Sequence, residues 1–231
     1  MSKTHPDQWT IGAAGPRPDP AALAALRGLA TTQLADADGP VAVVGPGIQH
    51  VAGDRELCGP AVTVWTKPGD ILFALKAVDL VTPGDVLVID GGGRLDAAVV
   101  GDIVAGALTG LGCAGLVVDG VVRDVAGITG TGLATFARGA HPATGSTTGP
   151  GAINVPVQVG GVAVRPGDLV RGDSSGLVVV PHEHLARTVA AGAAVAEREE
   201  QWRQRIAAGE PLPAATGIDD VLAGLRDGTA P

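Results

Sequence analysis

The sequence predicts a single α/β domain that is built on a central, partly parallel sheet with helices on its outer faces. Short runs of Val, Leu and Ile alternate with segments of helical periodicity, and Gly, Pro or Asp bounds each run. The length of 231 residues fits one domain. Hydrophobic residues make up 45% of the chain, and the core must be mostly aliphatic because aromatic residues make up only 2%.

The N-terminal part of the chain predicts an arm, a helix and then a series of strands. Residues 1–18 are polar and rich in proline, and we expect a loose, flexible arm there. Asp19 then precedes Pro20, a pair typical of an N-cap and the first residue of a helix, which continues to about Ala30. Six β-like runs follow, at Val41–Val44, Ala61–Trp65, Val86–Ile89, Gly115–Val118, Val155–Val159 and Leu177–Val180.

Helices are predicted between and after these strands. Two of them cover residues 70–81 and 102–111, and the second joins a strand ending at Asp90 to one starting near Ala114. A strand-helix-strand connection of this length joins parallel strands. A third, long helix is expected over residues 184–208. The domain is therefore predicted to span residues 19–210, with residues 211–231 as a C-terminal extension.

Charge and composition exclude several classes of protein. The net charge is −8 and the basic residues are scattered, so no surface for nucleic acid is expected. No run of eighteen apolar residues and no signal-peptide core are present, so we expect no membrane segment. The two cysteines are too few for a disulfide framework or a zinc ribbon, and we expect a reducing, cytoplasmic location.

Three segments around the predicted crossover carry functional chemistry. Residues 90–93 form a glycine-rich loop that can expose backbone N–H groups. Residues 101–104 open a helix, whose free N–H groups suit a carboxylate. The next strand leads to Arg123 and Asp124. The planar guanidinium of Arg123 can donate paired hydrogen bonds to a carboxylate, and the carboxylate of Asp124 offers oxygen ligands to a hard metal ion. Together these predict a site for a small carboxylate and a hard metal ion, although an Arg-Asp pair after a strand is also typical of a plain surface ion pair.

The spacing of these residues carries a family resemblance. The stretch GDVLVIDGGG…VVGDIVAGALTGLGCAGLVVDGVVRD resembles the 4-hydroxy-4-methyl-2-oxoglutarate / 4-carboxy-4-hydroxy-2-oxoadipate aldolases, which carry an Asp, twenty further residues and an Arg-Asp pair. Asp102 and Arg123-Asp124 match that pattern. The resemblance covers roughly residues 30–210 and includes the segments GPAVTV, INVPV, RPGDLV and GLVVVP. The family also contains the regulator of ribonuclease activity A, whose members share the fold and generally lack the complete set of residues.

The resemblance implies a layered α-β-β-α sandwich and a class II pyruvate aldolase that uses Mg²⁺ or Mn²⁺. In such an enzyme Asp124 would hold the metal, partly through waters. The helix start at Gly101, with the backbone N–H groups around Ile103 and Val104, would bind the carboxylate of a small 2-oxo acid substrate.

The resemblance also divides the chemistry between two side chains. Arg123 would bind the substrate and stabilise the enolate that forms when the C3–C4 bond breaks. Asp102 would position or activate a water that shuttles the proton. Because oxaloacetate decarboxylation passes through the same pyruvate enolate, the site is expected to support both reactions.

A neighbouring subunit is implied as well. Members of the family form trimers or hexamers and place a Glu from the adjacent subunit near the metal, on the last long helix. Glu199 is the best match, with Glu197 and Glu200 as competitors. The same acidic and basic run is also typical of a solvated helix face with i,i+4 pairs.

Alternative functions remain open at this point. A non-catalytic regulator that binds a ribonuclease or helicase partner has the same fold, but it has no need of three convergent polar groups. Relatives sometimes carry the label of a quinone methyltransferase. The sequence gives this function little support, because it has no convincing nucleotide-binding glycine loop. A Schiff-base lysine is ideally buried, whereas Lys67 stands in a turn beside Pro68 and Lys76 in a helix with a solvent face. We therefore expect structural roles for both lysines. The loop around His141 is expected either to connect two strands or to cover a pocket.

Overall fold

A ten-stranded sheet forms the centre of the protein, whose computed structural model describes residues 9–228. Its strands run in the order β2-β12-β11-β4-β5-β6-β7-β3, with β8 and β1 added beside β4. The bounds are β1 (Thr10–Ile11), β2 (Ala42–Val43), β3 (Gln49–Ala52), β4 (Leu57–Thr66), β5 (Val86–Val100), β6 (Gly115–Val122), β7 (Thr135–Ala140), β8 (Gly151–Ile153), β11 (Leu169–Asp173) and β12 (Gly176–Val180). A separate hairpin consists of β9 (Val157–Val159) and β10 (Val162–Val164).

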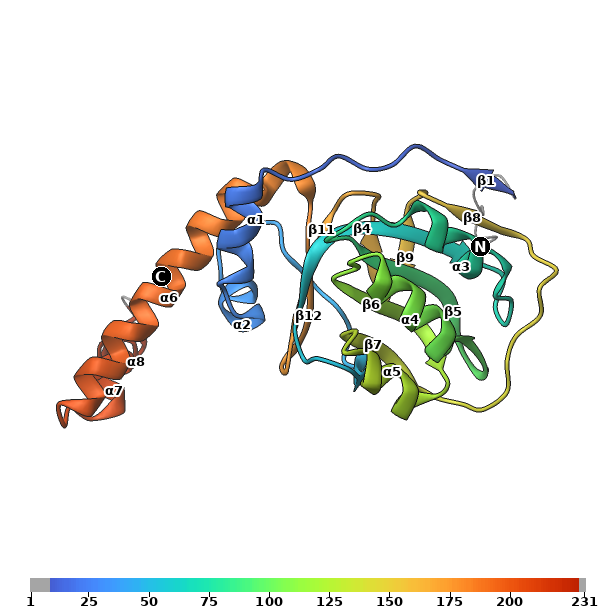
Figure 1. The fold of residues 1–231 in the computed structure, drawn as a ribbon. Coiled ribbons are helices and arrows are strands. Elements are labelled where there is room, and N and C mark those ends of the chain that lie inside the picture. The colour runs from blue at the N-terminus through green and yellow to red at the C-terminus, as the bar shows by residue number, and fades with distance from the viewer. Residues whose placement is uncertain (1–8, 229–231) are drawn as a thin grey trace.

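The sheet is partly parallel, as predicted. Strands β4, β5, β6 and β7 pair in parallel, whereas β11, β12, β2 and β3 pair antiparallel to their neighbours. The parallel block is the part in which helices connect successive strands: α3 (Leu72–Ala77) lies between β4 and β5, α4 (Asp102–Gly110) between β5 and β6, and α5 (Val125–Thr131) between β6 and β7. Figure 1 shows these three helices on the same side of the sheet.

Alternation along the strands produces the predicted α-β-β-α layers. In β5, Leu87 and Ile89 pack with the helices α3, α4 and α5, whereas Val86 and Val88 face the second β layer, which contains β9, β11 and β12. The outer side of that second layer is covered by α1 (Pro20–Arg27), α2 (Thr31–Ala35) and α6 (Leu185–Ala207) through a third apolar cluster. Successive side chains along the strand therefore pack into different layers, because they point to opposite faces of the sheet.

Most of the predicted helices are found with small shifts at their ends. Asp19 caps α1, because its carboxylate accepts a hydrogen bond of 2.9 Å from the backbone N–H of Ala22, although α1 ends at Arg27 instead of near Ala30. The helix predicted at 70–81 is the six-residue α3 followed by a 3₁₀ turn at Val78–Leu80. The predicted helices at 102–111 and 184–208 correspond to α4 and α6.

The predicted glycine-rich loop at residues 90–93 is wrong, because these residues belong to β5. That strand continues to Val100, with register shifts against β6 on both sides of Arg94. Gly92 and Gly93 have φ values of +68° and +71°, which side chains rarely tolerate. Gly91, Gly92 and Gly93 form a bulge without register partners on β6, between the paired residues Asp90 and Arg94. The sequence prediction also missed α2, α5, β1, β3, β7, β8, β10 and the two helices after residue 211, and most of these are too brief to show a clear period.

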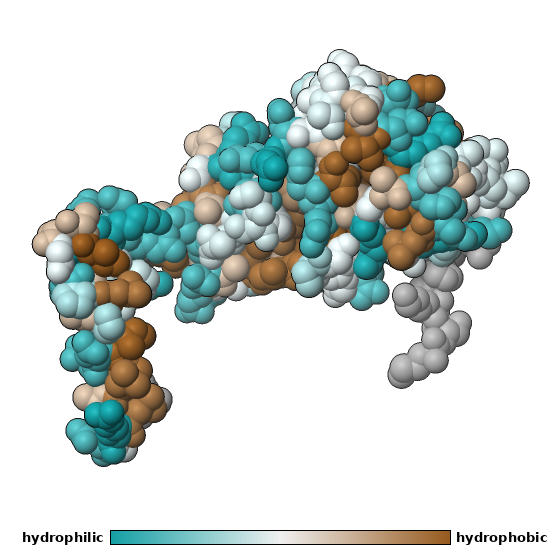
Figure 2. Space-filling view, turned by 90° about the horizontal axis from the view of Figure 1, so that it is seen from below, coloured by the Kyte–Doolittle hydropathy of each residue, from teal (hydrophilic) through white to brown (hydrophobic). Residues whose placement is uncertain are grey.

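The two ends of the described chain leave the sandwich in different ways. Residues 9–18 run along the domain, where β1 pairs in parallel with β8 and the Trp9 ring lies 5.7 Å from that of Phe73. At the other end α6 projects from the domain as a long arm, followed by α7 (Leu212–Thr216) and α8 (Ile218–Arg226) (Figure 1). Apolar side chains are exposed along this arm, and Figure 2 shows them as a brown stripe. Within residues 9–228, none of the helices combines the length and the hydropathy needed to cross a bilayer.

Candidate active site

The predicted site residues lie together where two neighbouring parallel strands end. Strand β5 ends at Val100 and leads through Gly101 into α4, while β6 ends at Val122 and leads through Arg123 and Asp124 into α5. Val100 and Val122 are register partners, and the N–H of Arg123 donates a 2.9 Å hydrogen bond to the carbonyl of Val100. Strand pairing therefore brings the end of β5 and the end of β6 into direct contact, although they lie about twenty residues apart in sequence.

Gly101 allows the Arg-Asp pair to approach the start of α4 closely. A Cβ atom at Gly101 would lie 2.5 Å from Oδ2 of Asp124 and 3.0 Å from Nε of Arg123, so no other residue fits without a shift. Nε of Arg123 lies 3.2 Å from Oδ2 of Asp124, and the two side chains are 38% and 42% exposed. The guanidinium and the carboxylate thus stand at the surface, paired with each other and open to a ligand.

Asp102 reaches the same place from the first turn of α4. Its Oδ2 would lie 2.8 Å from a Cβ atom added at Gly127, which places the carboxylate against the first turns of α5. Asp124 occupies the N-cap of α5 with left-handed backbone angles of φ 54° and ψ 42°, a conformation that Asp tolerates better than most residues. The two carboxylates therefore lie at the starts of neighbouring helices, Asp102 in the first turn of α4 and Asp124 at the N-cap of α5.

The start of α4 adds backbone donors to these side chains. The first intrahelical hydrogen bond of this helix runs from the N–H of Ala105 to the carbonyl of Gly101, at 3.1 Å. The N–H groups of Asp102, Ile103 and Val104 precede it and point along the helix axis, which suits the binding of a carboxylate. Ile103 is 80% exposed, so the approach to these N–H groups is open in the single chain.

A small cavity of about 130 Å³ lies beside this helix start. It is lined by residues 98–104 and Arg123, and by three residues that the sequence had not connected with the site: Ile71, Leu75 and Thr144. Thr144 belongs to the loop after β7, which runs along the end of β5. Ala98 donates from its N–H to the carbonyl of Ala143 at 2.7 Å. Of the two alternatives for the loop around His141, the structure thus favours the one in which it borders a pocket.

Asp70 fixes that loop from the other side. Its buried carboxylate accepts hydrogen bonds from the hydroxyl of Ser146 at 2.7 Å, from the N–H groups of Thr148 and Gly149 at 2.7 and 2.9 Å, and from the N–H of Leu72 at 2.9 Å. Burial opposes ionisation of this carboxyl, but the hydrogen bonds outweigh it and hold the pKa of Asp70 below its ordinary value. The turn at residues 68–70 therefore holds a wall of the cavity in place.

The donor set fits a hard divalent cation that keeps several waters. Among residues 9–228 no cluster of three or more His, Cys, Asp or Glu side chains is arranged to enclose a metal ion. Asp102 and Asp124 nevertheless offer two solvent-exposed carboxylates, and the missing Cβ at Gly101 leaves space beside Oδ2 of Asp124. Mg²⁺ is commonly bound through one or two carboxylates with water completing its shell.

The acidic residues of the last long helix lie elsewhere in the single chain. Glu199 accepts hydrogen bonds of 3.0 Å from Gln33 and from Arg203, and Glu200 accepts from Arg203 and Gln204. Both stand on the arm formed by α6, away from α4 and α5 (Figure 1). One chain alone thus brings together Gly101, Asp102, Ile103, Val104, Arg123 and Asp124, but not Glu199.

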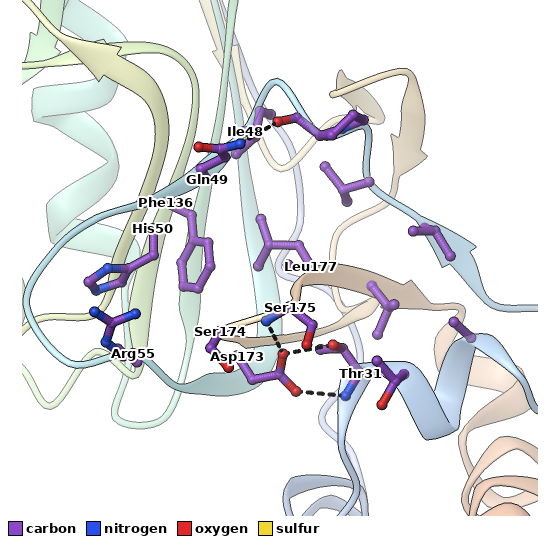
Figure 3. A pocket seen from close by; sticks show the side chains of 17 residues that line it. Thr31, Ile48, Gln49, His50, Arg55, Phe136, Asp173, Ser174, Ser175 and Leu177 are labelled. Carbon is purple, nitrogen blue, oxygen red and sulfur yellow. Dashed lines mark hydrogen bonds between the residues drawn. The ribbon is translucent and has the colours of Figure 1, made fainter. Parts of the chain in front are cut away.

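A cavity of about 570 Å³ is separate from this site and was not anticipated. It lies between β12 and β3, with Phe136 and Leu177 in its wall (Figure 3). Its carboxylate, that of Asp173, is hydrogen-bonded by the N–H and the hydroxyl of Thr31 at 2.8 and 2.7 Å. These bonds, with one from the N–H of Ser175, outweigh burial and lower the pKa of Asp173. Its role is therefore to join α2 to the β11-β12 turn.

Comparison with known proteins finds a matching family. The family model RraA-like, described as Aldolase/RraA, matches residues 31–179, a range that includes every polar residue of the candidate site. The chain belongs to the RraA-like family. One relative, from Halalkalibacterium halodurans, is 41% identical over 156 residues, which are 68% of this chain and 74% of the relative. It carries the provisional name 4-hydroxy-4-methyl-2-oxoglutarate aldolase.

Solved structures that are similar to this chain have the same fold. An uncharacterised protein from Pseudomonas syringae pv. tomato superposes with a TM-score of 0.75 and 30% identity, covering 87% of this chain and 99% of that one. RraAS2 from Streptomyces coelicolor, described as an unusual member of the RNase ES inhibitor RraA family, has a TM-score of 0.73 and 28% identity. The match to RraAS2 covers 82% of this RraA-like chain and 100% of the other. The predicted family and fold class are both confirmed.

Proposed function

We propose that this RraA-like protein is a divalent-metal-dependent aldolase, a carbon–carbon lyase that cleaves 4-hydroxy-2-oxo acids to pyruvate. The observation that carries the proposal is the convergence of Asp102, Arg123 and Asp124 at the start of α4. The aldolase name of relatives such as the one from H. halodurans supports the same reaction class. A purely structural ion pair would need neither a second carboxylate nor a cavity beside it.

In this proposal the metal ion is Mg²⁺ or Mn²⁺, held by Asp124 and by water. When bound, such an ion supplies Lewis-acid polarisation of the keto and carboxylate oxygens of a 2-oxo acid. The N–H groups at Ile103 and Val104 bind the substrate carboxylate, because a helix start presents unpaired donors and a partial positive charge.

The two remaining side chains handle charge and protons. The guanidinium of Arg123 stabilises the enolate oxygen, and this interaction strengthens as negative charge develops during bond cleavage. Asp102 orients a water that accepts the proton of the C4 hydroxyl and later returns one to C3 of the enolate. Oxaloacetate leads to the same enolate when it loses CO₂, so the proposal includes oxaloacetate decarboxylase activity.

The proposal also includes a homo-oligomer, a trimer or a hexamer, in which Glu199 of one chain approaches the site of the next. The support is the shape of the chain: α6 holds Glu199 against Gln33 of α2, away from the candidate site of its own chain. The end of the arm exposes an apolar stripe on α8, formed by Ile218, Val221, Leu222 and Leu225, which are 48–62% exposed. A stripe with i, i+3, i+4, i+7 spacing is typical of a helix that packs on a partner.

A coupled assay tests the function directly. The purified protein is expected to release pyruvate from 4-hydroxy-2-oxo acids and from oxaloacetate when Mg²⁺ or Mn²⁺ is present, and to stop when a chelator removes the metal. Re-addition of metal should restore the rate. No metal-dependent pyruvate release from any member of a panel of such acids would reject the proposal.

A non-catalytic regulator is the second candidate, because RraAS2 is described within an RNase inhibitor family. Such a protein would act by binding a ribonuclease or helicase partner through its surface. Stable co-purification with that partner, combined with no metal-dependent pyruvate release, would favour this alternative.

A further inference from the structure

The described part of the N-terminal segment, residues 9–18, is attached to the domain at both of its ends. At one end the N–H of Trp9 donates a 2.9 Å hydrogen bond to the carbonyl of Gly151, where β1 begins to pair with β8. At the other end Arg17 forms an ion pair with the buried carboxylate of Asp85. The position of Trp9 on the surface is therefore set by its own backbone and by the segment that follows it.

The indole ring of Trp9 lies against two different segments of the domain. Its centroid is 5.7 Å from that of Phe73 in α3, at an interplanar angle of 57°. A Cβ atom added at Gly149 would lie 2.6 Å from the same indole, so a side chain at position 149 would displace the ring. Gly149 belongs to the loop of residues 141–150, which connects β7 to β8 and is called the β7–β8 loop below. The ring thus joins α3 to this loop.

Both segments contribute to the wall of the small cavity at the candidate site. Ile71 and Leu75 stand two residues before and after Phe73 and line the cavity from the α3 segment. Thr144 lines it from the β7–β8 loop. The start of α4 and Arg123 line the same cavity. A contact that holds α3 and the loop together therefore holds two parts of this wall in place.

The end of the β7–β8 loop is held from both sides. The carboxylate of Asp70, which is fully buried, accepts a 2.9 Å hydrogen bond from the N–H of Gly149. The ring of Trp9, which is 57% exposed, contacts the same residue from the surface. Residues 142–148 are mostly exposed and consist of small or polar residues and Pro142, so the loop buries little apolar surface of its own. Few contacts offset the conformational entropy that its ordering costs, which makes each one important.

We propose that Trp9 is a positioning residue, whose ring keeps α3 and the β7–β8 loop in the arrangement that binds the substrate. This role rests on the aldolase function proposed above, and Trp9 acts through Phe73 and Gly149 instead of on the reacting atoms. A wall that is in place for only part of the time lowers the apparent affinity by that fraction. Loss of the ring therefore raises KM and leaves kcat nearly unchanged.

Amide hydrogen exchange tests the positioning without any reaction. The N–H groups of Ser146, Thr148 and Gly149 are hydrogen-bonded within the described structure. In Trp9→Ala we expect them to exchange about fivefold faster, the scale of one aromatic contact. Trp9→Phe keeps an aromatic ring and should exchange nearly as the parent does, and strand β6 serves as the internal reference. Unchanged exchange in the loop, or an equal acceleration in β6, would overturn the proposal.

Steady-state kinetics with oxaloacetate tests the link to substrate binding. Trp9→Ala should raise KM about fivefold and change kcat by less than about twofold, and Trp9→Phe should restore most of the affinity. Ile11→Ala is the matched control, since Ile11 is 51% exposed on the same N-terminal segment. An unchanged KM in Trp9→Ala, or an equal increase in Ile11→Ala, would overturn the role in binding.

The two measurements separate this inference from the proposed function. A parent protein that releases no pyruvate would reject the aldolase function, and with it the role of Trp9 in substrate binding. Loop exchange would still decide whether Trp9 orders the β7–β8 loop. Active protein with unchanged loop exchange in Trp9→Ala would instead reject the positioning role and leave the aldolase function intact.

Discussion

Oδ2 of Asp124 lies only 2.5 Å from the position that a Cβ atom of Gly101 would occupy. The backbone of Gly101, with φ −131° and ψ −169°, is an extended conformation that any residue adopts. Glycine is therefore needed at this position for space and not for its backbone angles. This contact connects the end of β5 with the end of β6 and determines how closely the Arg-Asp pair approaches the start of α4.

Gly101→Ala is expected to lower kcat/KM for pyruvate release by about a hundredfold, because displacing catalytic groups by about 1 Å has effects of this size. Steady-state kinetics with oxaloacetate measure this loss. Gly110→Ala is the control in the same helix, since a Cβ atom at Gly110 meets nothing within 4 Å. Equal activity of Gly101→Ala and the parent protein would show that the close approach has no catalytic importance.

Asp124→Asn is expected to weaken Mn²⁺ binding by at least about tenfold, because a charged oxygen ligand is replaced by a neutral one. Titration calorimetry or the electron paramagnetic resonance of free Mn²⁺ measures this without any reaction. Asp96→Asn is a suitable control, since Asp96 is an exposed carboxylate that pairs with Arg94 at 2.5 Å outside the site. Identical Mn²⁺ affinity in both variants would remove Asp124 from the proposed metal site.

Arg123→Ala should reduce kcat by about 10²–10³ while changing KM much less, because the guanidinium is proposed to act mainly on the developing enolate. The size of the effect is that of removing one preorganised donor from a transition state. Measurement of kcat and KM with oxaloacetate separates the two parameters. A variant that raised KM alone would assign Arg123 to ground-state binding.

Mixing of two inactive variants tests the shared site. If Glu199 of one chain serves the Asp124 of the next, then Asp124→Asn and Glu199→Gln proteins should each lose most activity. Hybrids formed by unfolding and refolding the two together should regain part of it, because some sites then contain both native residues. Glu200→Gln serves as the neighbouring control and should stay active. Hybrids without any recovered activity would argue against a contribution in trans.

Asp70→Asn should destabilise the protein by about 1–3 kcal/mol at neutral pH, the range for removing a buried hydrogen-bond acceptor. The pKa of Asp70 is lowered in the folded state, so its contribution is complete above the unfolded-state pKa of about 3.9 and is lost as pH falls through the folded-state pKa. The difference in unfolding free energy between parent and variant should therefore shrink in acid. Denaturant unfolding at neutral pH and below pH 4 measures it, and a pH-independent difference would contradict this account.

Much of the candidate site could be predicted from the sequence because its signals are local or regularly spaced. The Val-rich runs on both sides of residues 102–111 predicted a parallel crossover, and parallel strands end at the same edge of a sheet. That topology is enough to bring Asp102 near Arg123 and Asp124. The Asp19 cap was likewise predicted from two adjacent residues, and its hydrogen bond to Ala22 is present.

Other parts of the site depend on the path of the chain through space. The sequence contains no signal that Leu75 and Thr144 line one cavity, because they are brought together by a loop that Asp70 and the end of β5 hold in place. Residues 90–93 were predicted as a loop because local glycine content does not reveal that pairing with β6 resumes at Arg94, after a bulge of three glycines.

The sequence by itself thus predicted the partly parallel sheet from the periodicity of its strands. A family resemblance carried by residue spacing predicted the family and the three polar side chains of the candidate site. Only the tertiary structure decided which apolar residues surround those side chains and where α6 carries Glu199. Those contacts join segments far apart in sequence, and their geometry follows from the packing of whole layers and not from any local pattern.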